Sequence, residues 1–227
     1  MSETSPPQTR TPMSDLFATA VHRFGAAWAD LMVASITVLA VSSIPVVAVH
    51  ATGGTVPQTV LVGGFAYSIG YFCLLGFVML RGLPDGAPRR RVVWTYMTAV
   101  LIGTLSGALV LTLVTYAVVV LPLFLFAVPA IAAGDVGPGN ALVRSAGLAV
   151  RNFSRTWGVW LITLLFSAPI VLAMLLIVSA FADNTTSTLV GLALAAPIIW
   201  PFSALFVRAL YGDLTGRTVV APQDRTA

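Results

Sequence analysis

Three arginines stand close together in a region that is otherwise almost wholly apolar. The stretch "NALVRSAGLAVRNFSRTW", residues 140–157, carries Arg144, Arg151 and Arg155. If the stretch is one helix, spacings of seven and four residues place the three guanidinium groups within about 40° of one another. Such a face suits phosphate groups, and the whole pattern is typical of a helix at a membrane surface. The opposing apolar stripe would consist of Leu142, Ala146, Ala149, Val150 and Phe153.

A cytoplasmic charge cluster is one interpretation of these arginines, and it would close a helical bundle or hold a lipid phosphate. The cluster would contain Asp135, Arg144, Arg151, Arg155, Arg208 and Asp213. The alternative, which we favour for the last helix, is a snorkelling Arg208, an interfacial Tyr211 and a terminating Asp213.

Two further candidates lie inside apolar runs. Asp30, in "AAWADLMV", would serve as an ion- or proton-coupled site, or pair with an arginine such as Arg144. We favour instead a carboxylate at the membrane edge, hydrated among headgroups. Gly103 and Gly107, in "GTLSG", have the spacing that lets two membrane helices approach closely, within one molecule or between two, and we favour the former.

Enzyme chemistry is not expected, and neither is a metal or a cofactor. The chain has one cysteine, Cys73, in an apolar run, and two histidines, His22 and His50, which our topology places on opposite sides of a membrane. It has no phosphate-binding loop and no pairing of a nucleophile with a base. We therefore expect no catalytic residues.

The composition is that of a membrane protein. Hydrophobic residues make up 58% of the 227 residues and charged residues 9%, whereas charged residues make up about a quarter of a soluble domain. All 12 basic residues are arginine, and they are spread along the chain, so binding of nucleic acid is not expected. The fold class predicted is all-α: a polytopic helical membrane bundle of about six transmembrane helices plus two amphipathic interfacial helices on the cytoplasmic side.

Polar tails are predicted at 1–12, disordered and cytoplasmic, and at 218–227, flexible, on either side of a single membrane domain at 13–217. The arginines lie before the first predicted span, in alternate connections between spans and after the last span. Because cytoplasmic loops collect arginine, this distribution places both termini in the cytoplasm and the protein in the cytoplasmic membrane. The predicted spans are 26–49, 58–80, 92–111, 115–133, 157–182 and 188–210.

The segment 92–133 allows more than one topology, since its 42 residues carry no charge. A single straight helix would be about 63 Å long, roughly twice the hydrocarbon thickness. We therefore predict two crossings, with the second broken or shortened near Pro122 and Pro129. The alternative for the second leg is a re-entrant segment.

A short sequence twin indicates a repeat. "AVHRFGAAW", residues 20–28, and "AVRNFSRTW", residues 149–157, share Ala, Val, Phe and Trp at the same spacing. The similarity is either a coincidence or evidence of a parallel repeat. In such a repeat, 14–82 and 140–212 are copies of one unit, and 92–133 is a helical pair between them.

The loop "AGDVGPGNALVRSAGLAVRNFSRTWG" and the ending "PFSALFVRALYGDLTGR" resemble the membrane-domain family of the glycerophosphoryl diester phosphodiesterases and related bacterial integral membrane proteins. The resemblance extends from about Met13 to Arg217. It departs from the family pattern at Asp135, where the family has glutamate, and at Thr215, where it has arginine. It implies a membrane bundle only, since the family's phosphodiesterase chemistry belongs to a separate soluble barrel, of which nothing is found here.

The function expected is that of a non-enzymatic protein of the cytoplasmic membrane that binds anionic lipid, a membrane partner or a second copy of itself through its interfacial helices. The alternative is a small transporter or permease subunit. A transporter would need polar groups at mid-membrane, and the candidates are Asp30, Tyr67, Ser68, Ser106 and Ser167.

Overall fold

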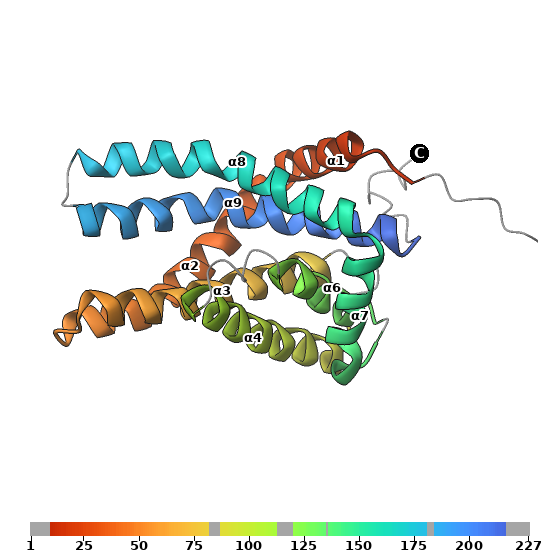
Figure 1. The fold of residues 1–227 in the computed structure, drawn as a ribbon, viewed down its shortest axis with the longest axis horizontal. Helices are drawn as coiled ribbons and strands as arrows, with labels where there is room; N and C mark the ends of the chain where they lie inside the picture. Colours follow the sequence, from red (N-terminus) through yellow and green to blue (C-terminus); the bar gives the residue numbers. More distant parts are fainter. Residues whose placement is uncertain (1–9, 82–86, 113–119, 135, 181–183, 217–227) are drawn as a thin grey trace, which may run out of the picture.

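The structure is a computed structural model of the chain, and it describes residues 10–81, 87–112, 120–134, 136–180 and 184–216 (Figure 1). The predicted tails therefore lie mostly outside the described residues. The described part is built of helices, as the all-α prediction requires.

Five helices are long and apolar enough to cross a membrane. They are α2 (Trp28–Ala51), α3 (Val56–Arg81), α4 (Arg89–Thr112), α8 (Phe153–Ser179) and α9 (Asn184–Leu214). Many of their leucines, isoleucines and valines are exposed on the protein surface, such as Leu165 and Leu176 of α8, which is what helices facing lipid require. The chain is a helical membrane protein on this evidence.

The long helices pack as neighbours along the chain and are joined through α9. Helix α2 packs on α3, α3 on α4 and α8 on α9, while α9 also packs on α2 and α3 (Figure 1). The centre of this packing is the second half of α9, where Phe202, Phe206 and Leu210 are buried. Helix α9 thus links α1 and α8 to the pair formed by α2 and α3.

The described part of the predicted fourth span is a short, broken helix. The described part, Val120–Ala132, is helical over 120–124, turns at 125–126 and continues as α6 (Ala127–Ala132). Its length of about 20 Å is below the hydrocarbon thickness, and residues 113–119 lie outside the described part. Pro129 explains the break, because it lacks the N–H that would bond the carbonyl of Leu125.

After α6, the chain lies again at the end of the bundle where α4 begins. A Cβ on Gly134 would lie 2.7 Å from the Arg91 guanidinium, so the end of α6 and the start of α4 are adjacent. One straight helix over 92–133 is therefore excluded, and a broken second leg, as predicted near Pro122 and Pro129, is confirmed.

Two short amphipathic helices precede the long pairs, α1 (Met13–Ala26) before α2 and α7 (Pro138–Arg151) before α8. Helix α7 crosses the end of the bundle, and α1 lies beside α9 (Figure 1). Helix α1 packs apolar side chains on the protein: Leu16 and Ala20 are buried, and Phe17 contacts the rings of Phe202 and Phe206 edge-on.

The same order of elements, a 14-residue helix and two long helices, therefore occurs twice. Both short helices end at similar backbone breaks, Ala27 (φ −121°, ψ 18°) and Asn152 (φ −121°, ψ 39°). The sequence twin aligns Trp28 with Trp157 and would place the second break at Thr156, whereas it lies four residues earlier, one helical turn. Duplication of one ancestral unit stays a prediction.

Candidate functional site

An ion pair between two largely covered side chains joins α8 to α9. Arg155, in the first turn of α8, pairs with Asp213, in the last turn of α9, and their side chains are only 13% and 10% exposed. The other oxygen of Asp213 accepts a hydrogen bond of 3.0 Å from the N–H of Thr11, and Arg155 donates to the carbonyl of Thr11. We call Thr11, Arg155 and Asp213 the latch, because they tie the segment before α1 to α8 and α9.

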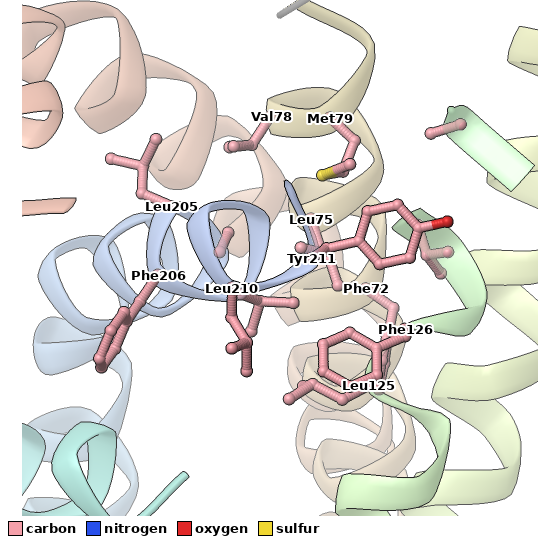
Figure 2. Packing of buried hydrophobic residues seen from close by; sticks show 14 of the residues in the cluster. Phe72, Leu75, Val78, Met79, Leu125, Phe126, Leu205, Phe206, Leu210 and Tyr211 are labelled. Atoms are coloured by element: carbon pink, nitrogen blue, oxygen red, sulfur yellow. The ribbon is translucent and has the colours of Figure 1, made fainter. Parts of the chain in front are cut away.

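Arg208 and Tyr211 make contacts with α3 and with Phe126. Arg208 donates a hydrogen bond of 3.1 Å to the carbonyl of Val78 in the last turn of α3, where the helix leaves its carbonyls without intrahelical donors. Tyr211, expected at the interface, is 2% exposed. Its ring lies 6.0 Å from that of Phe126 and beside the Leu75 turn of α3 (Figure 2). Tyr211 is thus packed inside the protein, and its position at the membrane interface stays a prediction.

The predicted stripe of three arginines is divided by the break at Asn152. The Asn152 side chain and backbone N–H both donate to the carbonyl of Leu148, which ends α7 before Arg155. The buried face of α7 is Ala141, Ser145 and Ala149. Of the predicted apolar stripe only Ala149 is buried, and Leu142 and Ala146 are partly covered, while Val150 and Phe153 are exposed.

Arg144 and Arg151 stay exposed on the outward face of α7, in line with each other at a spacing of seven residues. Asp213, their proposed partner, makes its described contacts with Arg155 and Thr11 instead. The predicted cluster is thus brought together only at Arg155 and Asp213, and Asp135 lies outside the described residues.

Asp30 forms an exposed ion pair at the start of a long helix. It lies in the first turn of α2 and pairs with Arg81, the last residue of α3, rather than with Arg144. The two side chains are 61% and 47% exposed. An exposed carboxylate at a helix start is stabilised by the helix dipole, and this geometry is that of an edge residue rather than of a buried ion site.

Gly103 and Gly107 face α3. A Cβ on Gly103 would collide with the backbone of Ile69, and one on Gly107 would lie 2.9 Å from Cα of Phe65. The two glycines therefore permit close backbone approach between α3 and α4 within one molecule.

Ser145 was not expected to have a role, yet it completes the broken helix. Its hydroxyl accepts a hydrogen bond of 3.0 Å from the N–H of Phe126 and donates one of 2.5 Å to the carbonyl of Leu123. Ser145 is fully buried, so it satisfies two backbone groups that the break at 125–126 would leave without partners. The only signal in the sequence was a serine amid small residues on one face of a helix.

A cavity of about 310 Å³ lies between α3, α8, α9 and Ser106 of α4, and the segment after 120 adds Leu121 and Leu125. Three of the five polar residues expected at mid-membrane, Tyr67, Ser68 and Ser106, line it, whereas Asp30 and Ser167 do not. We call this space the intramembrane pocket. Across it, the hydroxyls of Tyr71 and Ser203 share a hydrogen bond of 2.8 Å.

Within the described residues, no group of three or more His, Cys, Asp or Glu side chains is placed to hold a metal ion. No protein-family model matches the chain, and neither the curated proteins nor the solved structures contain a match. The resemblance to the glycerophosphoryl diester phosphodiesterase membrane domains therefore stays a prediction.

Proposed function

We propose that this protein is a non-enzymatic component of the cytoplasmic membrane, with both termini in the cytoplasm, and that it binds anionic lipid headgroups through α7. The single observation that carries the proposal is the outward face of α7. Two rows lie side by side there, Val143 with Val150 and Arg144 with Arg151.

The valine row suits the acyl-chain layer of a membrane surface, and the arginine row suits its headgroup layer. Val143 and Val150 are 73% and 63% exposed, which favours contact with acyl chains over water. Arg144 and Arg151 are exposed beside them, so their guanidinium groups can reach lipid phosphates. The opposite face of α7 is buried against the protein, so the helix is held at a fixed position for this contact.

Further arginines extend the positive surface. Arg89 and Arg90, at the start of α4, are exposed, and Arg91 beside them adjoins Gly134, four residues before the start of α7. A group of exposed arginines attracts anionic lipid at about 1 kcal/mol for each residue near the surface.

Native mass spectrometry of the purified full chain, titrated with phosphatidylglycerol or phosphatidylcholine, tests the proposal. We expect the wild-type protein to retain phosphatidylglycerol preferentially. The pair R144Q and R151Q should lose that preference, and the charge-retaining pair R144K and R151K should keep most of it. Equal retention of phosphatidylglycerol by the wild type and the glutamine pair would overturn the proposal.

A protein partner or a second copy bound to the same face is the competing outcome, and it would be seen as an added protein mass that the glutamine pair loses. The transporter alternative stays a prediction, and its substrate would have to bind in the intramembrane pocket.

A further inference from the structure

We propose that the intramembrane pocket binds an uncharged lipid whose head carries carbonyl or hydroxyl oxygens, such as a diacylglycerol. This site is separate from the headgroup-binding face of α7. The proposal concerns a different lipid class and does not depend on the function proposed above.

Ser106 supplies the first argument. Its side chain is 2% exposed, and within the described part of the chain its hydroxyl has no hydrogen-bond partner. Because Ser106 lines the pocket, a molecule inside the pocket can provide the missing partner. A buried hydroxyl without a partner is unfavourable, so an occupant with an oxygen atom is favoured over a purely apolar one.

The charge of the lining supplies the second argument. The polar side chains around the pocket are hydroxyls, namely Tyr67, Ser68, Tyr71, Ser106, Thr163 and Ser203, together with the indole N–H groups of Trp160 and Trp200. No acidic or basic residue is among the lining residues that the structure describes. Moving a phosphate or an ammonium group there would bury a charge without a counter-ion, so the occupant is uncharged.

The walls supply the third argument. Trp200 packs its ring against Tyr67 and Tyr71, with centroids 6.3 and 6.5 Å away, and forms an apolar wall. On the other side, Leu164 of α8 lines the pocket and is 42% exposed, on the helix whose apolar outer surface faces lipid. An occupant that enters past Leu164 comes from the hydrocarbon layer.

The size of the pocket limits what it can hold. A volume of about 310 Å³ is at the lower end of the range for small-molecule sites. It accommodates the glycerol ester head of a diacylglycerol with the first part of its chains, while the remaining chain extends past Leu164. Several hydroxyls around one space match a head with several oxygens better than a single fatty alcohol.

The test uses the full chain in nanodiscs and a diacylglycerol that carries a diazirine in one acyl chain. After illumination, peptide mass spectrometry should locate adducts in the parts of α3, α8 and α9 that line the pocket. Unlabelled dioleoylglycerol should compete. A quinone with an isoprenoid chain is also uncharged and carries carbonyl oxygens, so it is tested as a second competitor. Competition by dioleoylglycerol or by the quinone supports the site.

Ser35 offers a matched control, because it is also a buried serine whose hydroxyl has no hydrogen-bond partner among the described residues, but it lies on α2 outside the pocket lining. S106A should reduce adduct formation by about two- to tenfold, the effect of one lost hydrogen bond, whereas S35A should leave it unchanged. S106L and T163L, which fill the pocket from α4 and from α8, should each abolish competition.

Thermal unfolding and size-exclusion profiles show whether each variant folds. Because S106L and T163L fill the same pocket independently, the test can still be made if one of them does not fold. The proposal is overturned if both folded filling variants label like the wild type. It is also overturned if phosphatidylglycerol competes as well as dioleoylglycerol. The α7 glutamine pair should label normally, which separates this site from the headgroup site.

Discussion

The latch allows a quantitative comparison between two ion pairs in one chain. Arg155 and Asp213 are nearly covered, whereas Arg81 and Asp30 are about half exposed. Both pairs join an arginine to an aspartate on another helix, so burial is the main difference between them. We expect the covered pair to contribute far more to stability.

The loss of unfolding free energy follows from the cost of leaving one charged side chain buried without its partner. Removing one member of a buried pair costs about 3–5 kcal/mol, and for this partly exposed pair we expect about 2–4 kcal/mol for R155A or D213A. Each change also removes a hydrogen bond to Thr11. For a chain of this size, that corresponds to a fall in Tm of about 5–12 °C.

A double-mutant cycle isolates the pairwise part. The changes R155A and D213A, singly and together, should give a coupling free energy of about 2 kcal/mol. The changes R81A and D30A should give less than about 1 kcal/mol, and that coupling should fall further in high salt. Thermal unfolding in nanodiscs, followed by tryptophan fluorescence, measures all six variants. Equal coupling free energies for the two pairs would refute the reasoning from burial.

Three further predictions concern the fold. S145A should lower stability by about 1–2 kcal/mol, because the break at 125–126 loses its hydrogen bonds, and an unchanged Tm would contradict that role. G103A should cost about 1–3 kcal/mol by forcing α3 and α4 apart, while the control G147A, which meets nothing within 4 Å, should be neutral or slightly stabilising; equal Tm values would show that the close approach does not matter. In a cysteine-free background, N140C should react with an impermeant maleimide from the cytoplasmic face and T52C from the opposite face, and labelling of both from one face would refute the topology.

The long helices could be predicted closely because apolar length is a strong signal in a membrane. Helix α2 was expected at 26–49 and found at Trp28–Ala51, and α3 was expected at 58–80 and found at Val56–Arg81. The proline break was also predictable, because a missing N–H has a local effect that does not depend on the rest of the fold.

The break at Asn152 was missed because helical periodicity continues across it. An asparagine that bonds back to Leu148 was the only local signal, and such residues also occur within intact helices. That single error placed Arg155 on the wrong helix and hid its pairing with Asp213. Pairings such as Arg81 with Asp30, and the pocket itself, depend on which helices meet, and one sequence does not contain that information.

The position of α1 has a consequence for biosynthesis. Helix α1 leaves the ribosome before α9, the helix on which it mainly packs, and Thr11 reaches its place only when Asp213 has been made. Until α9 is made, the side chains of Leu16, Phe17 and Ala20 therefore lack the main protein surface that covers them. The membrane surface is the available temporary host for this amphipathic helix, and docking of α1 becomes the closing step of assembly. A fusion or tag at the N-terminus should then interfere with the last stage of maturation rather than with insertion of the helices.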